Sequence, residues 1–302
     1  MTFLPRALLA TALACALPAA LPTQAFAQQP PVSLKDLLEQ LKVKWNKPTE
    51  PFRIIGNVHY VGTDGLASYL ITGPQGHVLV DTGLIEANPQ IKANIAKLGF
   101  KLADVKILIN THAHIDHTAG LAELKAETGA QMISGEADKP ILEGGYYPNN
   151  DDPSLGFAPV KVDRTVKTGD VVELGPVRLT AISTPGHSPG CTSWAMQVEE
   201  AGAKHSAIIF CSATVALNKL VGRPTHPTIV EDYRATFAWA KTYKVDVLLA
   251  PHPEMYGMQK KRDAMGPGKP NPFVDPAEFN TYLASLEKAF DDGLAKQQAA
   301  AK

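Results

Sequence analysis

The sequence lacks an excess of charge of either sign. Its 302 residues include 29 Lys and Arg and 30 Asp and Glu, for a formal net charge of −1. The basic residues cluster only at Lys260-Lys261-Arg262. Because nucleic acids and anionic membranes bind basic surfaces, neither is expected as a partner.

Long apolar runs are also absent, since no stretch reaches the roughly 20 unbroken apolar residues that span a bilayer. Near the N-terminus, Arg6 precedes small and apolar residues from 7 to 20, and a small-x-small site ends at Ala27. This pattern predicts a secretory signal peptide over residues 1–27 rather than a membrane anchor. Cys15 leaves a lipoprotein site as the lesser alternative.

The predicted mature chain, residues 28–302, has about 275 residues, enough for one large domain with a substantial core. Hydrophobic residues make up 45% of the sequence, which is typical of a folded protein. Removal of Arg6 with the signal peptide leaves a formal charge of −2. The composition indicates no second domain.

Cysteine is scarce, and removal of the signal peptide leaves only Cys191 and Cys211. In an oxidising compartment the two can form a disulfide. Residues 191–198 and 206–212 are predicted strands, and a hairpin centred on Ala201 would place the cysteines opposite each other. Two buried free thiols are the alternative.

Short predicted strands alternate with helices and turns from residue 52 onward. The predicted strands cover residues 54–61, 67–72, 77–81, 106–110, 131–134, 177–183, 191–198, 206–212 and 245–249. The predicted helices cover residues 88–98, 119–124, 231–243 and 276–290, followed by a polar tail that we expect to be frayed. Because hairpins and helical crossovers are interspersed, two mixed sheets with helices on their outer faces fit better than one doubly wound sheet.

A further helix is predicted over residues 33–45, where Ser33 supplies an N-terminal cap and leucines line one face. We expect that face to cover the body of the domain. A lid near the mouth of a site is the less favoured role. The turn-rich segment 144–153 is interpreted as an exposed connection rather than the rim of a site.

The segment Thr111 to Thr118 is rich in potential metal ligands. It holds three imidazoles and a carboxylate within six residues: His112, His114, Asp116 and His117. A lone histidine is more often a hydrogen-bonded residue than a ligand, but neither burial nor solubility requires this cluster. A segment so short cannot direct four side chains at one ion. It therefore predicts a loop after a strand that divides its ligands between two neighbouring metal ions.

Two more histidines follow predicted strands in turn-forming sequences. His187 lies within Thr184 to Gly190, and His252 lies within Ala250 to Pro253. Proline and glycine shape the backbone so that an imidazole can project from a strand end. Each alone would more readily be a solvent-facing turn residue, but beside the first cluster both are candidate ligands.

The HxHxDH motif, the two later histidines and the segment Val80-Asp81-Thr82-Gly83 resemble the metallo-β-lactamase superfamily. The resemblance implies an α/β fold, an αββα sandwich of two mixed β-sheets. It implies two zinc ions, the first bound by His112, His114 and His187, and the second by Asp116, His117 and His252. Asp81 would be a structural aspartate near the site and not a ligand.

An absence favours one branch of this superfamily, because no aspartate lies between Asp170 and Asp232. Glyoxalase II and the lactonases place a metal-bridging aspartate in that stretch. The first β-lactamase subclass has a cysteine ligand there, for which Cys211 is a candidate. Subclass B3 has a serine instead, and Ser212 fits that place. His117 favours subclass B3, because the first subclass has no histidine ligand there.

The resemblance also implies the chemistry. Two zinc ions with six protein ligands leave a position for a water whose pKa falls to about 7, so that hydroxide can attack the lactam carbonyl. Asp116 would orient this hydroxide as well as bind metal. Ser212 and Thr214 would bind the substrate carboxylate, unless they only satisfy local backbone groups. Asn218 is a weaker candidate for substrate binding.

The function implied is that of a periplasmic, zinc-dependent β-lactamase that confers resistance to penicillins, cephalosporins and carbapenems. Its expected partner is a small β-lactam, with no nucleic acid and no membrane after removal of the signal peptide. A metallo-hydrolase of another cyclic ester, amide or thioester is the alternative. A non-catalytic zinc-binding scaffold is less favoured, because no ligand of the motif is missing.

Overall fold

The computed structural model describes residues 34–147 and 155–301. The predicted signal peptide and the capping serine at position 33 lie outside the described residues. Within those residues, no helix combines the length and the apolar character that crossing a bilayer requires.

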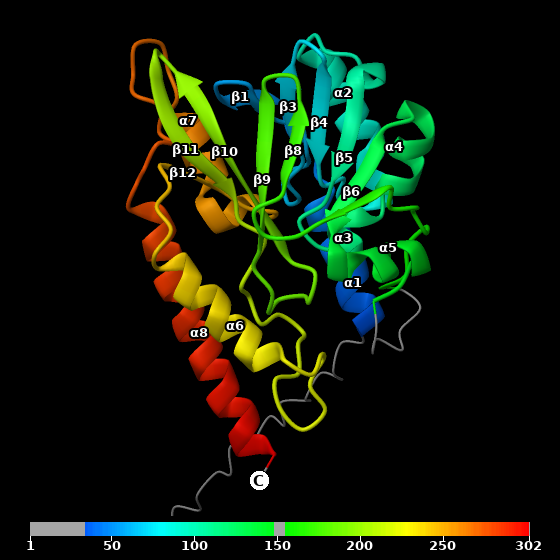
Figure 1. Ribbon diagram of the computed structural model, residues 1–302, viewed down its shortest axis with the longest axis vertical. Helices are drawn as coiled ribbons and strands as arrows, with labels where there is room; N and C mark the ends of the chain where they lie inside the picture. Colours follow the sequence, from blue (N-terminus) through cyan, green and yellow to red (C-terminus); the bar gives the residue numbers. More distant parts are fainter. Residues whose placement is uncertain (1–33, 148–154, 302) are drawn as a thin grey trace, which may run out of the picture.

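Two mixed sheets form the centre of the molecule (Figure 1). The first contains, in spatial order, β1 (Phe52–Ile55), β2 (Val58–Tyr60), β3 (Tyr69–Gly73), β4 (Gly76–Val80), β5 (Val105–Ile109), β6 (Gln131–Gly135) and β7 (Arg164–Val166). The second contains β12 (Val247–Leu249), β11 (Ala203–Ile209), β10 (Thr192–Glu200), β9 (Val177–Ser183) and β8 (Val171–Leu174). Strands β4 to β7 pair in parallel, as do β11 and β12, and the other pairs are antiparallel.

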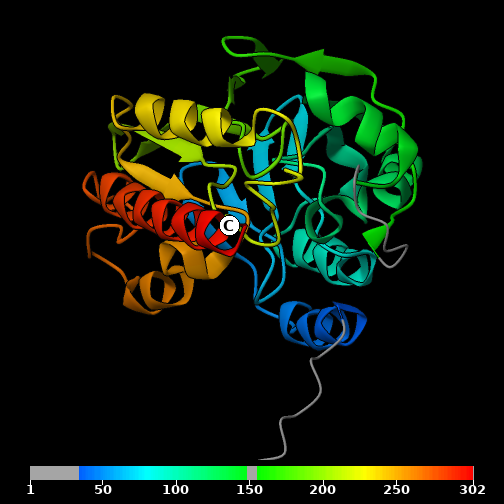
Figure 2. The ribbon, with the colours of Figure 1, turned by 90° about the horizontal axis from the view of Figure 1, so that it is seen from below.

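Helices cover the outer faces of both sheets. The first sheet is covered by α2 (Asn88–Lys97), α4 (Leu121–Thr128) and α5 (Lys139–Gly144), and the second by α6 (Ile229–Ala240) and α8 (Glu278–Ala300). Figure 2 shows α6 and α8 side by side on one flank, with α1 (Leu34–Trp45) at the periphery. The remaining helices are α3 (Ile115–Thr118) and α7 (Met258–Ala264). The predicted αββα sandwich is confirmed.

Side chains of the central strands alternate between two apolar clusters. In β3, Tyr69 and Ile71 join the larger cluster, to which both sheets contribute, whereas Leu70 joins the cluster beneath α2, α4 and α5. In β4, Leu79 likewise faces the second cluster, between Val78 and Val80 in the first. Because a slip of one residue would exchange these faces, the burial of both fixes the register of the sheet.

The predicted hairpin forms from β10 and β11, which are joined by Ala201 and Gly202 with φ of 52° and 81°. Its centre lies between these two residues, so Cys191 and Cys211 are one position out of register, beyond the last paired residues. They nevertheless form a disulfide, with Cα atoms 5.8 Å apart. The alternatives of two free thiols and of a metal-binding Cys211 are therefore wrong.

Three details of the predicted secondary structure are wrong. The strand expected over 54–61 is the hairpin of β1 and β2, because the chain turns at Gly56 with φ of 51°. The tail expected to be frayed continues α8 to Ala300; the Gln297 side chain accepts from the N–H of Leu220 at 2.7 Å and donates to the carbonyl of Asn218 at 3.0 Å. Strands β7 and β8, with three and four residues, and helices α5 and α7 were not predicted.

Candidate metal centre

Six candidate ligands converge from four places in the chain. His112 and His114 follow the end of β5, and Asp116 and His117 lie on α3 immediately after them. The other two come from the second sheet, with His187 beyond β9 and His252 beyond β12. The C-terminal ends of strands from both sheets therefore meet at one edge of the sandwich, where α3 lies (Figure 1).

The six residues form two groups of three. The donor atoms of His112, His114 and His187 lie within 4.8 Å of one another, and so do those of Asp116, His117 and His252. In the first group, the Nε2 atoms of His112 and His187 are 3.2 Å apart. In the second, Asp116 Oδ2 is 3.3 Å from His117 Nε2 and 3.4 Å from His252 Nε2. The rings of His112 and His117, with centroids 4.4 Å apart, place the groups next to each other.

The segment expected to be a loop is partly helical. His114 has extended backbone, with φ −86° and ψ 152°, and the single turn of α3 begins directly after it. Its carbonyl accepts from the N–H of His117 at 3.0 Å and from Thr118 Oγ1 at 2.9 Å. This change of backbone conformation turns Asp116 and His117 away from His114, and so divides four neighbouring residues between two groups.

The loop that carries His187 is held on both sides. Gly186 has φ of 133°, and a Cβ there would lie 2.8 Å from the Tyr233 ring, so the loop requires glycine. Thr236 Oγ1 donates to the carbonyl of Pro185 at 2.7 Å. Asn218 Nδ2 donates to the carbonyl of His187 at 2.9 Å. Asn218 therefore holds this loop in place.

Hydrogen bonds donated by the far ring nitrogen orient two of the imidazoles. His187 Nδ1 lies 2.7 Å from the carbonyl oxygen of Thr214, and His252 Nδ1 lies 3.3 Å from that of Gly65. A carbonyl can only accept, so each Nδ1 carries the proton and each Nε2 presents a lone pair. This is the tautomer that binds a metal through Nε2.

The ionisation of His114, His187 and Asp116 suits metal binding, whereas burial of His117 is outweighed by the carboxylates of Asp116 and Asp81, which raise the pKa of His117. Burial, helped by the neighbouring His187, lowers the pKa of His114 to about 3, and burial lowers that of His187 to about 4. Burial opposes ionisation of Asp116, but the charge on His117 and hydrogen bonds from His117 and His252 outweigh it and hold the pKa of Asp116 well below its usual range. Neutral imidazoles and a carboxylate are the forms in which these side chains bind metals.

Asp81 supports the site but belongs to neither group of candidate ligands. It is fully buried with φ of 55°, and its carboxylate accepts from the backbone N–H and the Oγ1 of Thr111, both at 2.7 Å. Burial raises the pKa of Asp81 to about 6. These two hydrogen bonds fix the residue that precedes His112, and they stabilise a backbone conformation that is unfavourable for a residue other than glycine.

Ser212 and Thr214 lie beside the first group. Ser212 Oγ accepts from the N–H of Thr214 at 3.2 Å, and Thr214 Oγ1 is 3.2 Å from His187 Nδ1. The local hydrogen bonds that the sequence left as an alternative are therefore present. Ser212 Oγ also lies 3.2 Å from Thr214 Oγ1, and either hydroxyl can donate to the other.

Two aromatic residues reach the site without having been identified from the sequence. The Trp45 ring, at the end of α1, lies 5.6 Å from that of His252, so α1 contacts the second group as well as the domain body. The Tyr147 ring lies 4.6 Å from that of His114, although its segment was interpreted as an exposed connection. No motif marks either residue, because both reach the site through tertiary packing.

Asp138 has a buried carboxyl group near the end of β5. No sequence pattern identifies this residue. Its Oδ2 accepts from Asn110 Nδ2 at 2.9 Å, and the Asn110 carbonyl accepts from Trp194 Nε1 at 2.9 Å. Burial raises the pKa of Asp138 to about 7. The end of β5 is thus tied to both sheets just before the ligands begin.

Comparisons with known proteins agree with this geometry. Residues 61–200 match the model of the metallo-β-lactamase superfamily. BJP-1, a subclass B3 metallo-β-lactamase of Bradyrhizobium japonicum, is 59% identical; the match covers 86% of this chain and 98% of that one, with a TM-score of 0.85. FEZ-1, a metallo-β-lactamase from Legionella gormanii, is 39% identical over 84% of this chain and 98% of that one, with a TM-score of 0.81.

A more distant match is the hydroxyacylglutathione hydrolase of Rhodospirillum rubrum, 30% identical over 137 residues, 45% of this chain and 42% of the relative. The chain spans less than half the length of the curated relatives it matches.

The fold and the paired ligand groups define a metal-binding hydrolase. The chain belongs to the metallo-β-lactamase superfamily, and its similarity to BJP-1 over nearly that whole chain places it in subclass B3.

Replacing Asp138 with asparagine should change how stability depends on pH. The folded pKa of about 7 exceeds the ordinary value of 3.8, so the unfolded chain ionises first as pH rises. The wild type therefore loses stability between these values, and the variant does not. We expect the free energy of unfolding of Asp138→Asn, relative to wild type, to increase by about 2 to 4 kcal/mol between about pH 4 and 7, and then to level off.

This difference is measured by urea unfolding of the two metal-free proteins at several pH values. A difference that does not vary with pH would show that Asp138 is ionised normally in the folded protein.

Proposed function

We propose that this protein is a periplasmic β-lactamase that uses two zinc ions to hydrolyse the amide bond of penicillins, cephalosporins and carbapenems. The observation that carries the proposal is the pair of adjacent three-residue groups at the meeting edge of the two sheets. The similarity to subclass B3 enzymes over nearly their whole length supports it. The signal peptide proposed for residues 1–27 would direct the chain to the periplasm.

The donor atoms fit zinc at both groups. Three imidazoles would hold the first ion, through His112, His114 and His187. Two imidazoles and a carboxylate would hold the second, through His117, His252 and Asp116. Nitrogen and oxygen donors in sets of three leave an open position in the four-coordinate geometry of a catalytic zinc site. When bound, the two ions would supply an activated water and an electrophile for the lactam carbonyl.

Asp116 would orient the attacking water. One of its oxygens faces the imidazoles of His117 and His252. The carboxylate can also accept a hydrogen bond from a water held between the groups, and its low pKa keeps it ionised at neutral pH. The attacking oxygen would then point a lone pair at the lactam carbonyl.

Ser212 and Thr214 would bind the substrate carboxylate. The Ser212 hydroxyl accepts from the Thr214 N–H, and its own hydrogen would be donated to the substrate carboxylate in place of Thr214 Oγ1. A hydrogen bond to a charged carboxylate is stronger than one between neutral groups, so this contact would fix the orientation of the lactam relative to His187.

Hydrolysis of a glutathione thioester is the second candidate function. The match to hydroxyacylglutathione hydrolases over part of the chain favours it. The absence of an aspartate between Asp170 and Asp232 argues against it, because the resemblance to those enzymes implies a metal-bridging carboxylate in that stretch. A scaffold that binds zinc without turnover is less favoured, because all six ligands are present.

Hydrolysis of imipenem and nitrocefin by residues 28–302 tests the proposal. We expect turnover that EDTA abolishes and added zinc restores, with a lactone and a glutathione thioester assayed in parallel. If the zinc-loaded protein is inactive toward both β-lactams but hydrolyses the thioester or the lactone, the protein is a metallo-hydrolase of that other substrate class. Inactivity toward every substrate would favour the scaffold.

His117→Ala should separate the two metal groups. His117 belongs to the second group only, so we expect the affinity of that group for zinc to fall by more than about 100-fold, beyond the usual effect of losing an outer-shell partner, while the first group changes far less. Zinc content after dialysis and competition with a chromophoric chelator measure the two affinities. Two tightly bound ions in the variant would contradict the assigned ligands.

Ser212→Ala should weaken substrate binding more than turnover. Loss of a hydrogen bond to the substrate carboxylate is expected to raise KM by about 10-fold and to change kcat much less. The methyl ester of the same β-lactam serves as the control, because it lacks the charge that Ser212 would bind. An equal rise in KM for the acid and the ester would exclude this role.

A further inference from the structure

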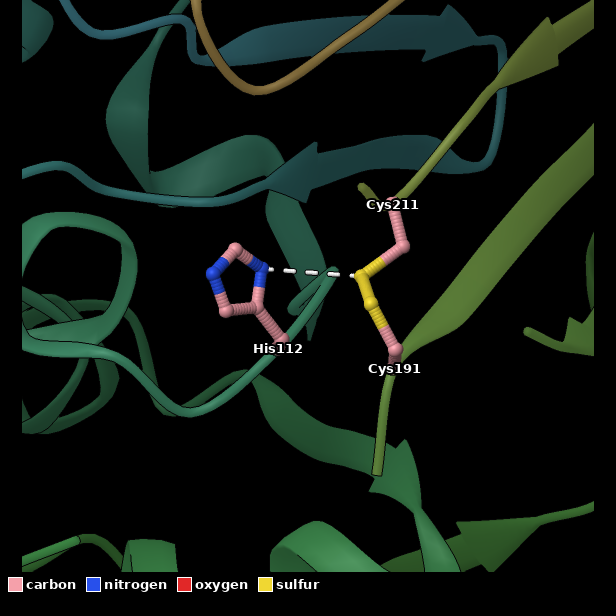
Figure 3. Close-up of side chains that lie close together, drawn as sticks. All are labelled: His112, Cys191 and Cys211. Carbon is pink, nitrogen blue, oxygen red and sulfur yellow. Dashed lines mark hydrogen bonds between the residues drawn. A yellow bond between two sulfur atoms is a disulfide. The ribbon is translucent and has the colours of Figure 1, made fainter. Parts of the chain in front are cut away.

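The disulfide lies directly behind a candidate metal ligand. Figure 3 shows the Cys211 sulfur facing the His112 ring, with Sγ 3.6 Å from Nδ1. The same sulfur is 3.2 Å from the carbonyl oxygen of Thr111, and both cysteines are fully buried. His112 thus has the disulfide on one side of its ring and, on the other, the Nε2 of His187 at 3.2 Å.

The chemistry of the sulfur fixes the direction of this contact. A disulfide sulfur carries no hydrogen, so it can accept from the His112 Nδ1–H but cannot donate. Thr111 Oγ1, 3.2 Å from the same nitrogen, gives its own hydrogen to Asp81 at 2.7 Å and can also only accept. Both neighbours of Nδ1 therefore favour the tautomer that leaves the Nε2 lone pair free.

We propose that Cys211, held by its disulfide to Cys191, is a positioning residue for the first metal group. Its sulfur would hold the His112 ring in the orientation and tautomer that direct Nε2 toward His187 and the ion. This inference rests on the ligand set proposed above. It assigns to the disulfide an effect on metal affinity that differs from its effect on the stability of the chain.

The two effects are separable because the backbone beside Cys211 has its own support. Ser193 Oγ accepts from the Cys211 N–H at 2.9 Å and pairs with Thr184 Oγ1 at 2.8 Å. The ladder of β10 and β11 ends at Trp194 and Ile209, so these hydroxyls continue the hairpin beyond it. Loss of the sulfur should therefore free the His112 ring before it displaces the backbone.

Two single variants test the proposal, because each breaks the same disulfide but only one removes the sulfur beside His112. In Cys211→Ala, we expect the affinity of the first group for zinc to fall by about 10-fold, as for other outer-shell partners, with the second group little changed. In Cys191→Ala, the remaining Cys211 sulfur should keep the first-group affinity within about 3-fold of wild type, below the range typical of a lost outer-shell partner. Both variants should have similarly lowered Tm values.

Ser193→Ala is the matched control. It removes the acceptor for the Cys211 N–H without touching His112. We expect a lower Tm with unchanged zinc affinity in both groups. Equal losses of first-group affinity in all three variants would show that the disulfide acts through the fold alone, and would overturn the proposal.

The nitrogen-15 signals of the His112 ring give a second readout in the zinc-loaded wild type, which is independent of whether the variants fold. We expect a proton on Nδ1 whose signal shifts when the disulfide is reduced. An Nδ1 without a proton would overturn the proposal, since the sulfur would have nothing to accept. A wild type whose first group binds no zinc would instead refute the proposed ligand set, before any variant is compared.

Discussion

The packing of the two sheets against each other is the constraint on which the site depends. Apolar side chains from both sheets fill one continuous cluster that extends beneath α6 and α8. This packing brings the ends of β5, β9 and β12 to one edge, although His112 and His252 are far apart in the chain. A change in strand register would move a ligand by a residue and to the other face, so the core determines the geometry of the metal groups.

At that edge, ionisable side chains are packed together, and their burial is unfavourable without support from the rest of the fold. His112, His114, His187 and Asp116 are buried among one another, and their burial disfavours charge. The surrounding structure offsets this cost with a directed hydrogen bond, which His187 Nδ1 donates to the Thr214 carbonyl, while the Thr111 N–H donates to Asp81 beside the site. Such hydrogen bonds fix the orientation of an imidazole, which reduces the ordering that metal binding would require.

Much of this arrangement could be predicted from local sequence. The HxHxDH spacing identifies His112, His114, Asp116 and His117 as candidate metal ligands, because so many ligand-forming side chains in six residues have few other roles. Alternating apolar residues identify most strands. What escaped prediction depends on distant contacts. The ring of Trp45 meets His252 only after α1 docks, and the last turns of α8 persist because Gln297 binds a loop some eighty residues away in the chain. The one-residue offset of the cysteines depends on a two-residue turn whose register no pattern of alternation specifies.

The disulfide also keeps Cys211 from acting as a thiolate ligand. A cysteine next to Ser212 in the sequence could have supplied a thiolate, and its sulfur does lie close to His112. Pairing with Cys191 leaves the Cys211 sulfur without the negative charge of a metal-binding thiolate, and this sulfur lies beside Nδ1 of His112 rather than beside Nε2. The hydroxyls beside the first group, those of Ser212 and Thr214, are neutral. A neutral hydroxyl can donate to a carboxylate that a thiolate would repel, so the disulfide is compatible with the substrate binding proposed for Ser212 and Thr214.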